Sequence, residues 1–187
     1  MSQRVVGQAP WPAADPLVGS LRTRVILLVG LPGSGKSTYA AQQNWPILSS
    51  DATRTLLLDE ITDQSANRTI FAMLRRILRQ RLELKRPITC IDATNLTRIE
   101  RRQYIRIAQM HGAELEAVYL DVPLEICKQR NLARARTVPD DVMDRFAAKL
   151  RPPLLSEGFT RVSVIRPTDV APATTPLPAA TSASQPK

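Results

Sequence analysis

A glycine-rich run around one lysine and one serine is the segment best suited to chemistry. It reads Gly30, Leu31, Pro32, Gly33, Ser34, Gly35, Lys36, Ser37, with Thr38 after it, and matches G-x-x-x-x-G-K-S. In this pattern backbone N–H groups surround phosphate oxygens, the lysine reaches the terminal phosphates and the serine hydroxyl ligates Mg²⁺. We therefore expect these residues to bind a nucleoside triphosphate, with Lys36 catalytic and Ser37 the metal ligand. The sequence lacks the guanine motif N-K-x-D, so ATP is favoured.

A carboxylate and a guanidinium stand three residues apart in S-S-D-A-T-R, at Asp51 and Arg54. Transfer of a phosphoryl group needs a carboxylate that orients the acceptor hydroxyl and takes its proton. A guanidinium beside it would hold an anion on the acceptor. We expect Asp51 to be the base and Arg54 to bind the acceptor. The alternative, an N-cap aspartate with an exposed arginine, is weaker beside a phosphate loop.

The apolar run before Asp92 predicts a strand. Polar residues stand at its carboxyl end, namely Asp92, followed by Thr94 and Asn95. An acid at such a position resembles one that holds Mg²⁺ through water. Hydrophobic strands also end in Asp for turn geometry, and Thr94 or Asn95 could instead cap the next helix. We place Asp92 and Asn95 among the residues that bind the acceptor.

An arginine-rich stretch follows Cys127 and extends to Arg151. Two helices joined near Pro139, with arginines facing inward, would form a lid over the triphosphate. Arg134 is our candidate for neutralising charge on the moving phosphoryl group, with Arg130 second, and both would contact the nucleotide. The alternative is a solvated basic helix.

Five short apolar runs predict the strands that position these residues. Helical patterns between them predict an α/β fold, a five-stranded parallel sheet with helices on both faces, whose carboxyl ends hold the ligand. The longest helix is expected over 66–85, with a second over 98–111 and a third starting at Pro123 after Asp121 as N-cap. The predicted strands are 25–29, 47–49, 88–91, 115–120 and 162–165.

Charge predicts an anionic partner beyond ATP. Lys and Arg number 26 against 17 Asp and Glu, a formal net charge of +9 at pH 7, which favours nucleic acid. Aromatic residues make up 4% of the chain, so binding would rest mainly on phosphate contacts. Cys90 and Cys127 lack metal-ligand or disulfide spacing and are expected to be buried.

Composition divides the chain of 187 residues into one domain with two flanking segments. We expect a poorly ordered leader over 1–21, a kinase domain over 22–166 with its lid at about 127–151, and a disordered tail rich in Pro, Ala, Thr and Ser over 167–187. The apolar runs are far below the ~20 residues of a membrane helix. A cytoplasmic protein without a membrane partner is expected.

Together these segments resemble the polynucleotide 5′-hydroxyl kinase group of P-loop kinases. The resemblance rests on G-L-P-G-S-G-K-S, S-S-D-A-T-R, D-A-T-N-L with Arg101 and Arg102 downstream, and R-N-L-A-R-A-R-T-V-P-D-D-V, and covers about 24–159. It implies that Asp51 is the general base, that Arg54 holds the 3′-phosphate of the acceptor nucleotide, and that Arg134 is the lid arginine. It also implies a five-stranded parallel sheet with a helical lid.

The resulting hypothesis is an ATP- and Mg²⁺-dependent kinase acting on the 5′-OH end of RNA or DNA. Two alternatives stay open at this point. One is a kinase for a small alcohol or nucleotide-sugar, as in zeta-type toxins. The other is a non-catalytic module that binds nucleic acid and uses ATP only to close its lid.

Overall fold

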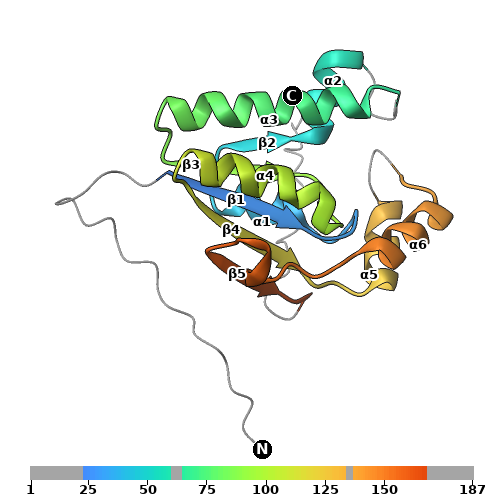
Figure 1. Cartoon of the computed structure of the whole chain (residues 1–187). Coiled ribbons are helices and arrows are strands. Elements are labelled where there is room, and N and C mark those ends of the chain that lie inside the picture. The colour runs from blue at the N-terminus through green and yellow to red at the C-terminus, as the bar shows by residue number, and fades with distance from the viewer. Residues whose placement is uncertain (1–22, 60–64, 134–136, 168–187) are drawn as a thin grey trace, which may run out of the picture.

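The computed structural model describes residues 23–59, 65–133 and 137–167, which form one parallel sheet with helices around it (Figure 1). The strand order is β2-β3-β1-β4-β5, with every pairing parallel. The predicted five-stranded parallel sheet is confirmed. Its strands are β1 (Arg24–Val29), β2 (Ile47–Ser49), β3 (Ile88–Asp92), β4 (Glu114–Leu120) and β5 (Arg161–Ile165).

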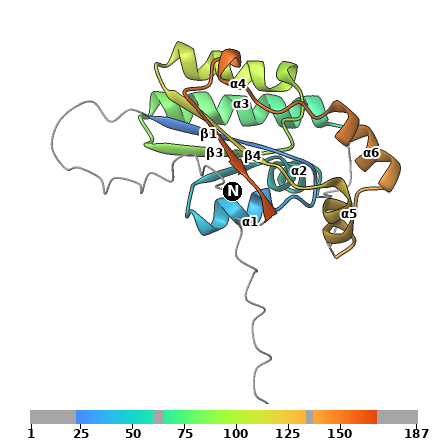
Figure 2. The same cartoon turned by 90° about the horizontal axis from the view of Figure 1, so that it is seen from below.

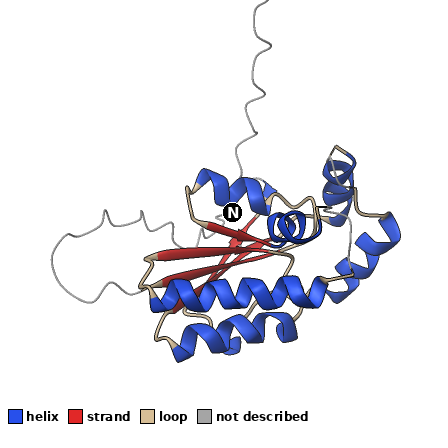
Figure 3. Cartoon of the chain, turned by 90° about the horizontal axis from the view of Figure 1, so that it is seen from above, coloured by secondary structure: helices blue, strands red, loops and turns tan. Residues whose placement is uncertain are grey.

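Helices cover both faces of the sheet, as predicted. Figures 2 and 3 show α3 and α4 on one face and α1 on the other, while α5 and α6 lie beyond one end of the strands. The helices are α1 (Lys36–Gln42), α2 (Ser50–Leu58), α3 (Asn67–Glu83), α4 (Arg98–Met110), α5 (Leu124–Leu132) and α6 (Asp140–Lys149), with a 3-10 turn η1 (Leu155–Glu157) before β5.

The central strand β1 explains why the fold needs two cores. Val25 and Leu27 pack with α3 and α4, whereas Ile26 and Leu28 face α1, α5 and α6. Each of these side chains is fully buried. Because alternate side chains of a strand point to opposite faces, a strand covered on both sides is apolar throughout.

Helix α3 buries one stripe of apolar side chains, while Arg68, Arg76 and Arg79 are exposed. Ile70, Leu74 and Leu78 have no exposed surface, and their spacing of four residues places them on one side of the helix. The helix ends at Glu83, before the predicted Lys85, which adopts φ +53.

One predicted helix cap is wrong, and the open alternative of a cap at Thr94 or Asn95 does not hold. Helix α4 starts from Thr97 in a capping box with Glu100, not from Thr94 or Asn95, since only Thr97 stands three residues before a glutamate. Helix α5 has Pro123 at the N-cap, with ψ 142. Asp121 instead accepts a hydrogen bond from the hydroxyl of Tyr119 at 3.1 Å.

Several expectations fall outside the residues that the structure describes. They concern the leader over 1–21, the tail from 168 onward, and Arg134. Cys90 and Cys127 are free and buried, as predicted. Among the placed residues no helix combines the length and apolarity needed to cross a bilayer.

Candidate active site

A cavity of about 520 Å³ lies at the carboxyl ends of β1, β2 and β3. Several segments line it: the phosphate loop (residues 30–37), the starts of α2, α3 and α4, the end of β3 with the loop after it, and the lid helices α5 and α6. Parallel strands bring their carboxyl ends to one edge of a sheet, so segments distant in sequence meet there. The predicted residues in its wall are Pro32, Gly33, Gly35, Lys36, Ser37, Thr38, Asp51, Arg54, Asp92 and Arg130.

The phosphate loop joins β1 to α1 in a shape that requires glycine. Gly35 is the N-cap of α1 with φ +94, and Gly33 has φ +79. A Cβ on Gly33 would collide with the carbonyl oxygen of Cys127 in α5. The missing side chains leave a backbone cradle at a helix N-terminus, which fits the phosphates of ATP.

Lys36 lies over this loop. Its Nζ donates hydrogen bonds to the carbonyl oxygens of Gly30 at 3.0 Å and Leu31 at 2.7 Å. The side chain is buried, with 8% of the residue exposed. The ammonium is therefore held at the mouth of the cradle, where it can reach phosphate oxygens.

Ser37 and Asp92 meet although they are distant in sequence. The Ser37 hydroxyl donates to Oδ2 of Asp92 at 2.6 Å. A hydroxyl and a carboxylate beside a phosphate cradle are the oxygen ligands that Mg²⁺ prefers. The pair therefore fits a magnesium site, and Asp92 lies on the donor side of the cavity.

Asp51, Arg54 and Asn67 form a second polar group across the cavity. Nη1 of Arg54 donates to Oδ1 of Asp51 at 2.9 Å, and its Nη2 donates to Oδ1 of Asn67. The Asp51 side chain is 35% exposed, whereas that of Arg54 is 5% exposed. The carboxylate thus faces the cavity, while the buried guanidinium fixes its position and ties α2 to α3.

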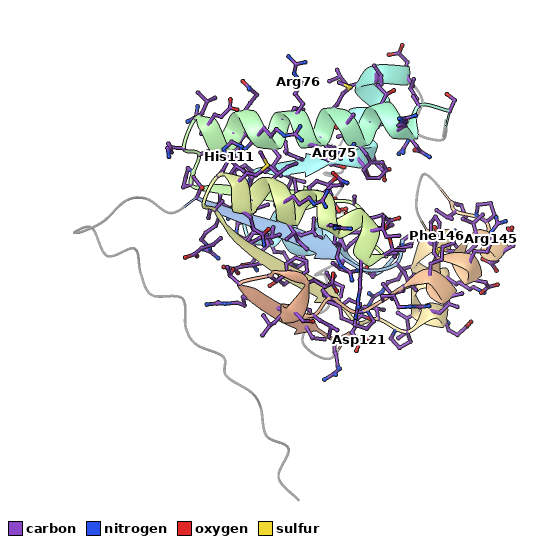
Figure 4. All side chains as sticks on the ribbon, viewed as in Figure 1. Arg75, Arg76, His111, Asp121, Arg145 and Phe146 are labelled. Carbon is purple, nitrogen blue, oxygen red and sulfur yellow. The ribbon has the colours of Figure 1, made fainter. Side chains whose placement is uncertain are left out.

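The lid helices close the far side with Arg130, Val138, Phe146 and Lys149. Figure 4 shows Phe146 and Arg145 on α6 at this end of the molecule. Lys128 of α5 pairs with Asp144 of α6 at 2.6 Å. The predicted lid of two helices is therefore present.

Burial raises the pKa of Cys127 to about 11, and the positive charges of Lys36 and Arg130 partly offset this rise. Both cations therefore lie close to the same point, where α5 packs against the phosphate loop. Their combined field favours a polyanion in the cavity.

A buried arginine joins the segment that follows α6 to the loop after β3. Arg101 of α4 is fully buried and pairs with Glu157, with Nη2 2.7 Å from Oε1. Its Nη1 donates to the carbonyl oxygens of Asn95, Leu96 and Arg151. The chain leaving α6 is therefore fixed beside the loop that follows β3.

Some predicted residues lie away from the cavity wall. Asn95 is 3% exposed, and its Nδ2 donates to the carbonyl oxygen of Leu28 at 2.7 Å, so it holds β1 rather than facing an acceptor. Gly30, Leu31 and Ser34 belong to the phosphate loop but are buried within it and do not line the cavity.

Sequence reasoning missed Asn67 and Phe71, which line the cavity from the first turns of α3. Their spacing of four residues on an amphipathic helix was the available signal. It did not show which end of the helix meets the cavity.

Comparison with known proteins gives one family and several relatives. A family model described as AAA domain matches residues 25–153. A bifunctional polynucleotide phosphatase/kinase of Schizosaccharomyces pombe is 26% identical over 148 residues, which cover 75% of this chain and 33% of that protein. An L-seryl-tRNA(Sec) kinase of Methanococcus maripaludis is 28% identical over 138 residues, covering 69% of this chain and 53% of that protein.

The chain therefore spans between a third and about half of the length of these two relatives. Among solved structures, a putative kinase from Chloroflexus aurantiacus superposes with a TM-score of 0.62 at 17% identity, over 79% of this chain and 87% of that one. That likeness concerns the fold, and it agrees with the parallel sheet and phosphate loop described above. The chain belongs to the AAA domain family, as a P-loop kinase.

Proposed function

We propose that this kinase transfers the γ-phosphoryl group of ATP to the 5′-hydroxyl end of a nucleic acid. The observation that carries the proposal is the placement of Asp51 in the same cavity as Lys36, Ser37 and Asp92. A carboxylate held by an arginine, opposite a phosphate cradle, is the arrangement that phosphoryl transfer to an alcohol requires. We assign this activity to one domain over 22–166.

The donor side of the cavity binds and orients the triphosphate. The loop backbone and Lys36 hold the phosphates, and Ser37 and Asp92 are the residues that would hold Mg²⁺. Bound there, Mg²⁺ would neutralise charge on the phosphate oxygens. Arg130, exposed in the lid wall, stabilises charge on the transferred group. Arg134 has the same proposed role but lies outside the part of the chain that the structure describes.

The acceptor side supplies the base. Asp51 accepts the proton of the hydroxyl as the hydroxyl oxygen bonds to the γ-phosphorus. The bond from that phosphorus to the β-phosphate oxygen breaks, and ADP leaves. Arg54 keeps the carboxylate aimed at the hydroxyl through its bond to Asp51. Its guanidinium borders the cavity and would also attract a phosphate on the acceptor.

Two facts support a nucleic acid as the acceptor. The formal net charge is +9, which favours a polyanion. The names of the two relatives given above describe kinases that act on a polynucleotide and on an L-seryl-tRNA, a substrate that includes a nucleic acid.

The test is transfer of radiolabel from γ-labelled ATP to an oligonucleotide with a 5′-OH end. We expect label on this strand and none on the same strand carrying a 5′-phosphate. Asp51→Asn should lower the rate by about 10²–10⁴-fold, because it removes a general base while keeping the shape of the side chain.

Asp59→Asn is the matched control. Asp59 is an exposed residue at the end of the same helix, with φ +56, a conformation that asparagine tolerates. It should keep full activity. An unlabelled 5′-OH strand, together with retained ATP binding, would contradict the proposed acceptor.

A small alcohol is the second candidate acceptor. The observation in its favour is the lid wall, where Val138 and Phe146 add apolar surface to a cavity of about 520 Å³. Salt separates the two candidates. A polynucleotide releases counterions on binding, so its KM should rise steeply with ionic strength, whereas an uncharged alcohol should respond little.

A further inference from the structure

Three arginines form a stripe along α3. Arg68, Arg75 and Arg79 are spaced by seven and four residues, which places them within about 40° of one another around the helix axis. Arg68 and Arg79 are exposed and Arg75 is half-buried. Figure 4 shows Arg75 on the side of α3 that faces α4, whereas Arg76 points away from both helices.

The stripe also lies close to α4, through Arg75. Burial raises the pKa of Tyr104 in α4 to about 12, and the nearby charge of Arg75 partly lowers it. Arg75 of α3 and Tyr104 of α4 therefore lie near each other. Arg102 and Arg106 of α4 are exposed and add positive charge to the same layer of the molecule.

Carboxylates of the described residues form no ion pair with Arg68, Arg75 or Arg79. Arg75 and Arg79, four residues apart, repel each other on the helix surface. A stripe of this kind does little for the stability of the helix. It presents a positive potential to solvent.

The stripe also begins at the active site. Asn67 and Phe71 line the cavity from the first turns of α3, and Arg68 lies between them in sequence. From Arg68 to Arg79 the helix rises about 16 Å, the length of about five phosphates of a duplex strand at 3.4 Å each. A strand whose 5′ end lies at Asp51 can therefore continue along α3.

We propose that the stripe Arg68, Arg75 and Arg79 binds the phosphate backbone of the acceptor polynucleotide, away from its 5′ end. This inference rests on the proposed function for what fills the cavity. It assigns the stripe a role in affinity and in length preference, with no part in the transfer step. A short acceptor reaches only the cavity, whereas a longer strand gains contacts to α3.

The test compares two variants that each remove two positive charges. Arg75→Gln with Arg79→Gln changes the stripe. Arg161→Gln with Arg166→Gln changes exposed arginines at β5, on the opposite side of the molecule (Figure 1). Binding of a 3′-fluorescein 20-mer with a 5′-OH end is followed by anisotropy from 50 to 200 mM salt, without a catalytic step. Circular dichroism verifies that both variants are folded.

K is the association constant for the 20-mer, and log K decreases with log salt. For the α3 variant we expect this slope to become shallower by about 1.4 for single strands or 1.8 for a duplex. In the transfer assay its KM for the 20-mer should rise by about tenfold, with KM for a nucleoside 3′-monophosphate unchanged. The β5 variant should keep the wild-type values.

Equal losses in both variants, or an unchanged slope and KM in the α3 variant, would overturn the role of the stripe while leaving 5′-end phosphorylation intact. Binding that depends on the stripe without any label transfer would instead count against the proposed function alone. A wild-type protein that binds poly-glutamate but not the 20-mer would overturn the inference in favour of an acidic protein partner.

Discussion

The donor and acceptor sides of the cavity are built in different ways. The donor side is mainly a short continuous loop, with glycines at positive φ and Lys36 bonded to loop carbonyl oxygens, and Asp92 of β3 adds one carboxylate to it. The acceptor and lid side draws single side chains from α2, α3, α5 and α6. Backbone defines the first side, and side chains from distant segments define the second.

This difference shows where one kinase fold can change its substrate. A cradle of backbone N–H groups binds any triphosphate and loses its shape if a glycine is replaced. An acceptor wall of separate side chains can be altered one residue at a time. Specificity therefore belongs to α2, α3 and the lid.

The largest expected effect is the loss of turnover when a lysine of the donor side is replaced, compared with a lysine of the lid wall. Lys36→Ala should lower turnover by at least about 10³-fold, because it removes a cation from the phosphates that carry the developing charge. Lys149→Ala, in the lid wall, should cost far less. Steady-state kinetics with saturating ATP measures both. Similar losses for the two lysines would erase the distinction between the sides.

A double-mutant cycle on Ser37 and Asp92 tests the donor side next. Ser37→Ala and Asp92→Asn should each raise the Mg²⁺ concentration needed for half-maximal activity by about 10–100-fold. Because the two side chains share one hydrogen bond, the double variant should lose little more than either single one. Activity titrated with Mg²⁺ gives the three values. Fully additive losses would show that the residues act separately.

Asn67→Ala tests the acceptor side alone. It removes the oxygen that accepts from Nη2 of Arg54, a charge-assisted hydrogen bond. We expect KM for the acceptor to rise about tenfold, since such bonds contribute about 1.5–3 kcal/mol. KM for ATP should stay at its wild-type value. A parallel rise in KM for ATP would mean that the two sides are coupled.

The smallest expected effect is a change in the alkylation rate of Cys127, the residue of α5 that packs against the phosphate loop. Its pKa of about 11 leaves on the order of one thiol in a thousand ionised at pH 8, and the thiolate is the reactive form. Iodoacetamide should therefore modify native Cys127 slowly at pH 8 and faster as the pH approaches 11. The unfolded chain supplies the reference rate. Rapid native alkylation at pH 8 would indicate that α5 separates from the loop.

The phosphate loop was predictable because its chemistry is local, whereas Asp92, expected among the acceptor-binding residues, joins Ser37 from 55 residues away. Gly33 to Ser37 are adjacent in sequence, and the alternation along β1 follows from burial on both faces. The five strands and the amphipathic α3 were predictable for the same reason. Each is defined by a repeat within its own segment.

Long-range packing produced the errors. Asn95 looked like an acceptor ligand, but its amide crosses to β1, 67 residues earlier. The role of Arg54 in joining α2 to α3 depends on Asn67, 13 residues later in the sequence. Such pairings leave no periodic trace in a sequence.

Arg101 also bears on the order in which the protein becomes complete during synthesis. Its partner Glu157 follows 56 residues later, and the carbonyl of Arg151 follows 50 residues later. Until those residues leave the ribosome, burying the Arg101 guanidinium would strand a charge, at a cost of about 3–5 kcal/mol. The nascent kinase must therefore wait for the 3-10 turn η1, which precedes its last strand, before the segment after α6 and the loop after β3 can pack together.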